Sequence, residues 1–207
     1  GAINIAGVDF AAKSRSELRQ HRKDIQIVFQ DPYGSLNPRR TIGSQLIQGA
    51  INFGVPRKEA WERVYKLLDI VRMPRDSINR FADQFSGGQR QRLCIARALV
   101  VNPKVLIADE AVSALDVSIQ REVLKLLGDI RDRLGLTVIF ITHDLRVAAQ
   151  VCDDVIVMQH GKVVERGGVD QIFNAPAHEY TRSLLAAQPG QAWDIPVFEE
   201  GDDLARI

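Results

Sequence analysis

The chain has 207 residues, of which 45% are hydrophobic and 26% are charged, and its formal net charge is +1. This composition predicts a globular domain with a hydrophobic core and excludes a wholly disordered chain. The small net charge gives no general reason to expect nucleic acid or an anionic membrane as a partner. No apolar run reaches the ~20 residues of a spanning helix, so we expect no direct membrane insertion and a membrane role only through a partner protein.

The first part of the chain predicts a hairpin and a short helix. In residues 1–10 isoleucines alternate with small or polar residues and Gly7 marks a turn, which indicates the end of a β-hairpin whose beginning is missing. Residues 14–23 are polar, and we expect Ser16 to cap a short helix there.

A strand and two helices are predicted next. Residues 25–29 form an apolar run that ends at Gln30, before an Asp-Pro pair that turns the chain. A glutamine at the end of a strand is usually a bystander rather than a ligand. Residues 41–52 are compatible with a helix, and residues 56–71 predict a clearer one with a single apolar stripe that we expect in the core. The stripe consists of Ala60, Trp61, Val64, Leu67, Leu68 and Val71.

The centre of the chain predicts a helix that can bind an anion at its start. Ser86 suits a helix N-cap, and Gly87 and Gly88 place no side chain where the first free backbone N–H groups point. A phosphate is the natural ligand of such a helix start. The helix is expected to continue over residues 89–101, where apolar residues recur at helical spacing. Cys94 on this helix, like Cys152 further on, is expected to be a small core residue of a protein in a reducing compartment.

A short strand ending in two acids follows this helix. Residues 105–108 are continuously apolar, which predicts a strand buried on both faces of a parallel sheet, and Asp109 and Glu110 come directly after them. Ligands bind beyond the carboxyl ends of strands in open α/β sheets, so these acids suggest a metal ligand beside a general base. Alone, a Ser-Gly-Gly is usually a capped loop and an Asp-Glu a solvated strand end. Together at this spacing they are more specific.

The remaining elements are a helix, a strand and a hairpin. Residues 117–134 are amphipathic and return through Gly135 to residues 137–142, which predict another buried strand ending at His143. Such a histidine could simply cap a neighbouring helix. A hairpin over residues 155–165 turns at Gln159-His160-Gly161. Three strands thus end in polar side chains, which a parallel sheet brings to one edge. These side chains are Gln30, Asp109 with Glu110, and His143.

Several of these motifs resemble those of the ATP-binding cassette (ABC) ATPases. FSGGQ at 85–89 resembles their LSGGQ signature, VLIADE at 105–110 their Walker B strand, and SALD at 113–116 their D-loop. IVFQDP at 27–32 and ITHDL at 141–145 resemble the Q-loop and the H-loop. The resemblance implies an α/β fold, in which a P-loop NTPase-like core of mainly parallel sheet flanked by helices carries an α-helical signature subdomain.

The resemblance also implies a division of the chain. Residues 1–30 would be a partial ATPase core ending in the Q-loop, and residues 31–101 the helical subdomain with the signature, whose groove receives a coupling helix from a membrane partner. Residues 102–170 would be core with Walker B, D-loop and H-loop. Residues 171–207, with the run PAHEYT, resemble the C-terminal extension of oligopeptide, dipeptide and nickel importer ATPases. The extension has no cysteine cluster, so we expect no iron–sulfur centre.

One motif of the family is missing. The chain contains no Gly-x-x-x-x-Gly-Lys-Ser/Thr, the Walker A loop that supplies most contacts to the phosphates. We therefore expect an N-terminally truncated cassette, inactive as a fragment. Whether the natural protein also lacks the loop stays open. The acidic, aperiodic residues 192–207 are expected to be flexible.

By resemblance, the chemistry would divide between two nucleotides. Asp109 and Gln30 would coordinate Mg²⁺ on ATP, while Glu110 would act as general base. His143 would contact the γ-phosphate. A second set would serve the nucleotide of a facing ABC ATPase domain, in a homo- or heterodimer. That set comprises Ser86, Gly87, Gly88 and Gln89, and the binding residue Asp116 would cross the interface and couple the two sites.

The resemblance implies an ATPase subunit of an ABC transporter, peripheral on the cytoplasmic face of the inner or plasma membrane. It would bind integral membrane permease subunits and power the import of peptides or similar small solutes. Two alternatives are a soluble ABC ATPase acting on DNA or ribosomes and a non-catalytic ABC-like interaction module. The stretch from Gln30 to Ser86 is too short for the coiled-coil insertion of the first alternative, and basic residues are dispersed. Only the absent Walker A favours the second.

Overall fold

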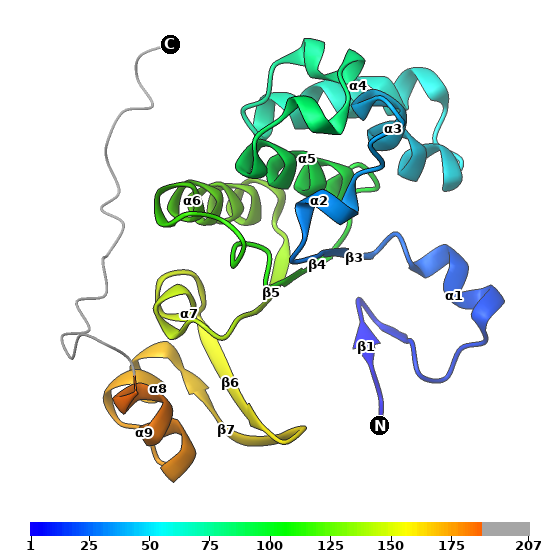
Figure 1. The fold of residues 1–207 in the computed structure, drawn as a ribbon. Coiled ribbons are helices and arrows are strands. Elements are labelled where there is room, and N and C mark those ends of the chain that lie inside the picture. The colour runs from blue at the N-terminus through cyan, green and yellow to red at the C-terminus, as the bar shows by residue number, and fades with distance from the viewer. Residues whose placement is uncertain (188–207) are drawn as a thin grey trace. The chain divides into compact units, whose positions relative to one another are not determined.

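The computed structural model describes residues 1–187, so the acidic stretch 192–207 lies outside the described residues. Two compact units make up the structure. The first unit spans Gly1–Ile141, and the second begins at Thr142 (Figure 1).

A three-stranded parallel sheet organises the first unit. Its strands are β3 (Ile25–Val28), β4 (Val105–Asp109) and β5 (Thr137–Ile141), in the order β3-β4-β5. Val28 lies opposite Ala108 and Asp109 opposite Ile141, so the three carboxyl ends lie along one edge. This is the arrangement that the apolar runs of the sequence predict.

Helix α5 (Gly87–Leu99) is the central helix of the first unit. In Figure 1 it lies between the sheet and the pair formed by α3 (Ile42–Asn52) and α4 (Arg57–Ile70), and it contacts both helices and β3. Nearly every residue in the middle of α5 is buried, because neighbours surround it on several sides. The shorter elements around it are α2 (Pro32–Ser35) and the 3₁₀ turns η1 (Arg75–Asn79) and η2 (Ala82–Gln84).

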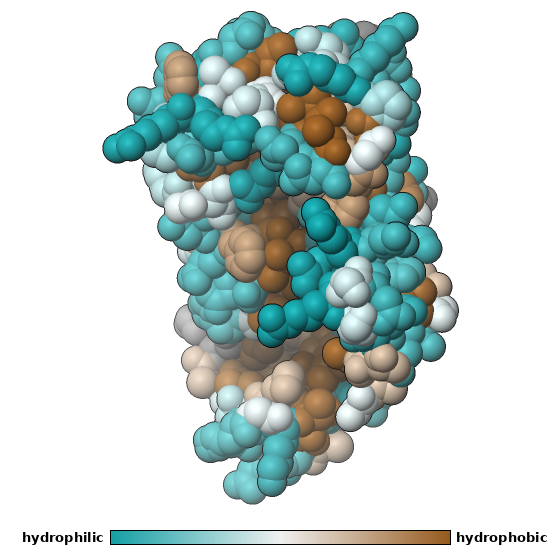
Figure 2. Space-filling model, turned by 90° about the vertical axis from the view of Figure 1, so that its right-hand side faces the viewer, coloured by the Kyte–Doolittle hydropathy of each residue, from teal (hydrophilic) through white to brown (hydrophobic). Residues whose placement is uncertain are grey.

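The sheet is buried on one face only, which differs from the prediction for β4 and β5. Leu106 and Ala108 are fully buried, whereas Ile139 and Ile141 are each 48% exposed and Ile27 is 37% exposed. An apolar run identifies a strand but does not show whether other elements pack against both of its faces, so the prediction of burial on both faces is wrong. Figure 2 shows hydrophobic surface exposed between hydrophilic side chains on one side of the molecule.

Helix α6 (Val117–Leu134) joins β4 to β5 and ends as the sequence indicates. Gly135 has φ of 59°, a left-handed conformation that suits glycine at the end of a helix. The predicted inward face is correct in its middle, where Val123 and Ile130 are fully buried. Helical spacing puts Leu134 on the same apolar stripe and predicts that it faces inward, but it is 48% exposed, because it stands in the last turn, beyond the packed part of the helix.

The N-terminal segment forms a small hairpin and a capped helix. Strands β1 (Asn4–Ile5) and β2 (Val8–Asp9) pair across Gly7, and α1 covers Arg15–His21. The predicted cap residue is wrong. Ser14 caps α1 rather than Ser16, because Glu17 stands three residues after Ser14 and completes a capping box by accepting from its backbone N–H.

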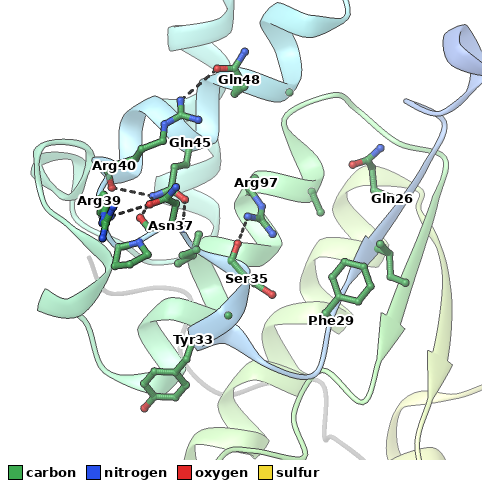
Figure 3. Close-up of a pocket in the computed structure, with 16 residues that line it drawn as sticks. Gln26, Phe29, Tyr33, Ser35, Asn37, Arg39, Arg40, Gln45, Gln48 and Arg97 are labelled. Atoms are coloured by element: carbon green, nitrogen blue, oxygen red, sulfur yellow. Dashed lines mark hydrogen bonds between the residues drawn. The ribbon is translucent and has the colours of Figure 1, made fainter.

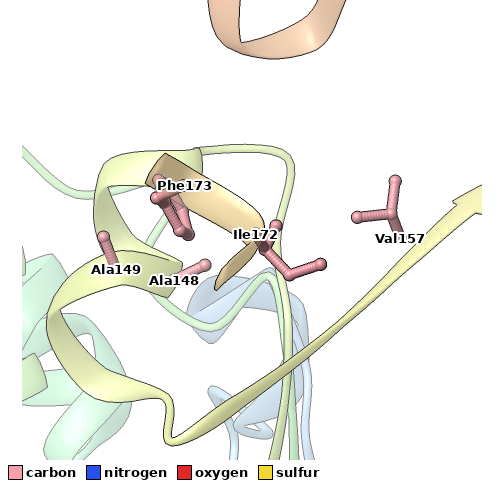
Figure 4. Packing of buried hydrophobic residues seen from close by; sticks show 5 residues of the cluster. All are labelled: Ala148, Ala149, Val157, Ile172 and Phe173. Carbon is pink, nitrogen blue, oxygen red and sulfur yellow. The ribbon is translucent and has the colours of Figure 1, made fainter. Parts of the chain in front are cut away.

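The second unit consists of a hairpin covered by three short helices. Strands β6 (Asp154–Gln159) and β7 (Lys162–Gly168) are antiparallel and turn at His160 and Gly161, as predicted. The helices are α7 (Leu145–Val151), α8 (Val169–Asn174) and α9 (Glu179–Ala186). Its buried cluster joins α7, β6 and α8 (Figure 4). The cluster comprises Ala148, Ala149, Val157, Ile172 and Phe173.

A buried carboxylate holds the C-terminal helix against the hairpin. Glu165 of β7 accepts hydrogen bonds from the backbone N–H groups of Ala177 (2.6 Å) and His178 (3.1 Å). The Thr181 side chain, followed by these N–H groups, lowers the pKa of Glu165. His178 then caps α9 by accepting from the Tyr180 N–H. The Pro-x-His-x-Tyr-Thr run therefore has a structural role.

Within residues 1–187 no helix is both long and apolar enough to cross a bilayer.

Candidate active site

Polar side chains gather at the carboxyl edge of the parallel sheet. Gln30 follows the last residue of β3 by two positions, Asp109 is the last residue of β4, and Glu110 comes next. Because β3 and β4 are paired in parallel with Val28 opposite Ala108, the three side chains belong to neighbouring strand ends. Gln30 is exposed, and Asp109 and Glu110 are half-buried.

The backbone fixes Glu110 in an uncommon conformation. Its φ is 47°, in the left-handed region that costs a non-glycine residue about 1–2 kcal/mol. Its N–H donates to the Ile141 carbonyl (2.9 Å), and its carbonyl accepts from the N–H (3.1 Å) and the hydroxyl (2.9 Å) of Ser113. Hydrogen bonds to β5 and to the following turn thus hold the backbone of Glu110 in this conformation. A strained residue beside an acid at a strand end is the kind of outlier that marks functional sites.

His143 belongs to the second unit, two residues after the last residue of β5. Its side chain is exposed. His143 does not cap α7, because Asp144 is the N-cap of that helix and accepts from the Arg146 N–H (2.9 Å). The nucleotide contact predicted for His143 stays a prediction.

The start of α5 is capped as the sequence predicts. The Ser86 hydroxyl accepts from the Gln89 N–H (3.3 Å), and the Gln89 side chain accepts from the Ser86 N–H (3.0 Å). This capping box occupies two of the N–H groups that every helix start leaves without an intrahelical partner. The N–H groups of Gly87 and Gly88 are the remaining donors with which this helix start could bind an anion.

The two glycines also have packing roles that the sequence did not indicate. A Cβ at Gly88 would lie less than 3.0 Å from Cγ2 of Ile119, and one at Gly87 would lie 3.5 Å from Cδ2 of Leu115. Gly88 is buried. The start of α6 therefore packs against the start of α5, and this contact excludes a side chain at Gly88.

Asp116 is the N-cap of α6 and is adjacent to this contact. Its carboxylate accepts from the Ser118 hydroxyl (2.6 Å) and the Ile119 N–H (3.0 Å). These two hydrogen bonds, of which that from the Ser118 hydroxyl has the larger effect, lower the pKa of Asp116. Since Ile119 also contacts Gly88, the structure joins the SGGQ and SALD motifs into one surface.

A groove lies beside these elements, between β3, the segment 33–40, α3 and α5 (Figure 3). Its volume is about 920 Å³, and the residues that line it include three arginines and no acid. Gln45 shapes one wall, because its side chain bonds to both the N–H (2.7 Å) and the carbonyl (3.0 Å) of Asn37. Phe29 and Tyr33 are among the side chains that line the groove (Figure 3). The arginines are Arg39, Arg40 and Arg97.

Two residues that line this groove and connect it to α5, Tyr33 and Arg97, were not predicted from the sequence as part of a site. Tyr33 packs under the Arg90 guanidinium, and Arg97 donates to the Ser35 carbonyl. A local signal for α2 was present, because Asp31 followed by Pro32 is a cap followed by proline in the first helical turn. That signal predicts a helix rather than only a turn.

The oxygen ligands at the sheet edge suit one kind of metal. Among residues 1–187, no three histidine, cysteine, aspartate or glutamate side chains gather as a metal site. Mg²⁺ does not need such a cage, since it binds through one or two protein oxygens together with phosphates and water. The carboxylate of Asp109 and the amide oxygen of Gln30 are donors of that kind.

Comparison with known proteins agrees with the motifs. The family model described as ABC transporter matches residues 1–113. A putative peptide import ATP-binding protein of Brucella ovis is 50% identical over 190 residues, which cover 91% of this chain and 60% of that protein. The dipeptide transport ATP-binding protein DppF of Escherichia coli is 44% identical over 190 residues, covering 91% of this chain and 57% of that protein. The chain thus spans about 60% of the length of the curated relatives it matches.

Two solved structures share the fold. The structure of cbiO1 from Clostridium perfringens, part of the ABC transporter complex cbiONQ, has a TM-score of 0.75 and 32% identity, covering 90% of this chain and 72% of that one. A dimeric structure of the ATP-binding cassette MJ0796 in a post-hydrolysis state with ADP and Pi has a TM-score of 0.66 and 29% identity, covering 80% and 72%. The predicted α/β fold class is confirmed.

Proposed function

Because this chain belongs to the ABC transporter family, we propose that it is part of an ATP-hydrolysing subunit that powers the import of peptides or similar small solutes through a membrane permease. The relatives named peptide or dipeptide transport ATP-binding proteins support this substrate class. The observation that carries the proposal is the gathering of Gln30, Asp109 and Glu110 at one sheet edge, in the same unit as a glycine-rich helix start.

Asp109 and Gln30 would hold Mg²⁺ at this edge. When bound, the metal neutralises charge on the β- and γ-phosphates of ATP. The two residues differ in their freedom. Asp109 lies within the β4–β5 ladder, whereas Gln30 follows its strand in an exposed segment. Asp109 would therefore fix the site, while Gln30 could change position with the occupancy of the site.

Glu110 would orient the attacking water and accept its proton. Hydrogen bonds hold its backbone on both sides, which would restrict the positions open to the carboxylate and suits a reaction that depends mainly on positioning. His143 would contact the γ-phosphate and stabilise charge that develops on it.

The start of α5 would serve a nucleotide bound to a second ABC ATPase domain. The Gly87 and Gly88 N–H groups, the Ser86 hydroxyl and Gln89 would face its phosphates, and Asp116 would stand beside them at the same interface. Hydrolysis would then require a homo- or heterodimer. The contact between Gly88 and Ile119 supports a concerted role, because it fixes the relative position of the two motifs.

The groove of Figure 3 would receive a helix of the permease. The groove has three arginines and no acidic lining residue, which suits a partner helix that carries an acidic side chain. Phe29, which is 50% exposed, suits contact with an apolar side chain of the same partner helix. The subunit would then lie on the cytoplasmic face of the membrane without entering it. Copurification of an intact cassette with a permease, abolished by charge reversal at Arg39 and Arg40, would support this assignment. Retention of the permease by that variant would contradict it.

Replacing the proposed base tests the catalytic assignment. In an intact cassette that contains this chain and a Walker A loop, Glu110→Gln should abolish phosphate release while ATP still binds. Glu62→Gln is the matched control, because Glu62 is an exposed glutamate of α4. Unchanged phosphate release by the Glu110 variant would refute the role.

The 207-residue chain by itself is expected to bind ATP weakly and not to hydrolyse it, because it has no phosphate-binding loop. A titration with fluorescent ATP measures this. Micromolar affinity of the isolated chain would contradict the expectation.

A further inference from the structure

Helix α2, which directly follows Gln30, is attached to α5 at two points. At the first, the guanidinium carbon of Arg90 lies 4.4 Å from the centroid of the Tyr33 ring. At the second, Arg97 donates a hydrogen bond to the Ser35 carbonyl. Arg90 and Arg97 are seven residues apart, so they lie on one face of α5. A single stripe of α5 thus holds both ends of α2.

The first attachment is at the N-terminal turn of α5. The Arg90 Nε donates to the carbonyl of Phe85 (2.9 Å), the residue before the N-cap Ser86. The Tyr33 hydroxyl lies only 3.3 Å from the position that a Cβ at Gly87 would take. Arg90 therefore connects the Tyr33 ring to the backbone that positions the glycine N–H groups.

The segment between Gln30 and Tyr33 is short and internally bonded. The carboxylate of Asp31 accepts from the Tyr33 N–H (2.8 Å), and its carbonyl accepts from the Ser35 hydroxyl (2.7 Å). These bonds make residues 31–35 one rigid turn. A displacement of Gln30 would therefore be expected to move the Tyr33 ring rather than be absorbed in between.

We propose that Tyr33 is a positioning residue that, with Arg90, couples Gln30 to the start of α5. The inference rests on the proposed function, in which Gln30 senses one nucleotide and the α5 start binds the nucleotide of the facing domain. The occupancy of one site would then set the position of the Gly87 and Gly88 N–H groups at the other. Tyr33 is 57% exposed, so this ring contributes little to the core.

The kinetic test uses an intact cassette containing this chain and compares Tyr33→Leu, Arg90→Gln and the double variant. An exposed cation–π contact corresponds to about a two- to fivefold effect, so each single variant should lower kcat by about that factor. The affinity for ATP should stay unchanged, because the phosphate-binding loop is not altered. The double variant should be no worse than Arg90→Gln alone, since Tyr33→Leu removes only the ring contact that the Arg90 change already removes.

Two variants serve as controls. Tyr33→Phe keeps the ring and should keep full kcat. Tyr65→Leu removes another tyrosine that lies under an arginine, with the Arg75 guanidinium 5.7 Å from its ring in the region of α4 and η1, and should leave kcat unchanged. Equal loss in the Tyr33 and Tyr65 variants, or additive losses in the double variant, would overturn the proposal.

Hydrogen exchange on the 207-residue chain tests the coupling without ATP. The Gln89 and Arg90 N–H groups bond to the Ser86 side chain and carbonyl, and they should exchange about two- to fivefold faster in Tyr33→Leu. Exchange in α4 should not change. Unaltered exchange at Gln89 and Arg90 would overturn the proposal. If instead the unaltered cassette neither binds nor hydrolyses ATP, the proposed function fails, and the exchange measurement still decides whether Tyr33 positions α5.

Discussion

The contact between Gly88 and Ile119 gives the sharpest prediction for stability. Replacing Gly88 by alanine puts a methyl group less than 3.0 Å from Cγ2 of Ile119, where it does not fit. Ile119 is β-branched and helical, so its side chain has one strongly preferred rotamer and cannot easily turn away. Overpacking of this kind costs about 1–3 kcal/mol, while exchanging glycine for alanine in a helix returns up to about 1 kcal/mol. We expect Gly88→Ala to lower the free energy of unfolding by about 1–2 kcal/mol.

Urea unfolding of the 207-residue chain, followed by circular dichroism, measures this difference. Gly128→Ala in α6 is the matched control, because a Cβ there meets no atom within 4 Å, and it should stabilise the chain by about 0.5–1 kcal/mol. The double variant Gly88→Ala/Ile119→Ala should lose less stability than the two single variants together. The difference in unfolding free energy should be at least about 1 kcal/mol. Equal stability of Gly88→Ala and the unaltered chain, or additive effects of the two changes, would refute this steric conflict.

Three further predictions follow from single groups. Ser86→Ala removes the α5 cap and should cost about 1 kcal/mol in urea unfolding, with Ser86→Gly costing less; equal stability of Ser86→Ala and the unaltered chain would show that the capping box contributes nothing. Glu165 has a lowered pKa in the folded chain, so its stabilising contribution is present at neutral pH and is lost as the pH falls through that pKa. Glu165→Gln should therefore lower the melting temperature at pH 7. The melting temperature of this variant should also fall less on acidification than that of the unaltered chain, and an equal fall in both would contradict this role of Glu165. Burial raises the pKa of Cys94 to about 11, so a thiol reagent at pH 8 should modify Cys94 only after unfolding, and rapid modification of the folded chain would refute this.

The strand ends were predictable because their signal is local. The apolar runs before Gln30 and Asp109 identify strands, and the parallel connection through a helix brings their ends together. The contact of Gly88 with Ile119 joins residues from two helices, and neither residue carries a local sign of it. The sequence pattern points to Gly88 only for its effect on backbone N–H groups, not for this packing.

The errors have the same physical origin. Ser14 and Ser16 are equally good caps in isolation, and the distinction comes from Glu17, whose side chain completes the box only for Ser14. The exposure of Ile139 and Ile141 depends on what packs against the sheet, which hydrophobic periodicity does not report. For His143, the resemblance of ITHDL to an H-loop predicts a contact with the γ-phosphate. The positions of β5 and α7 alone do not define such a contact, so it stays a prediction.

The half-covered sheet has a consequence for the behaviour of the chain in solution. Aliphatic side chains of β3 and β5 meet water on a face where parallel sheets are normally dry. Exposure of these isoleucines to water is unfavourable, so copies of the chain should associate through this face as the concentration rises. Colloidal stability, rather than unfolding, should therefore set the concentration at which the isolated chain can be handled, and a mild detergent should extend it.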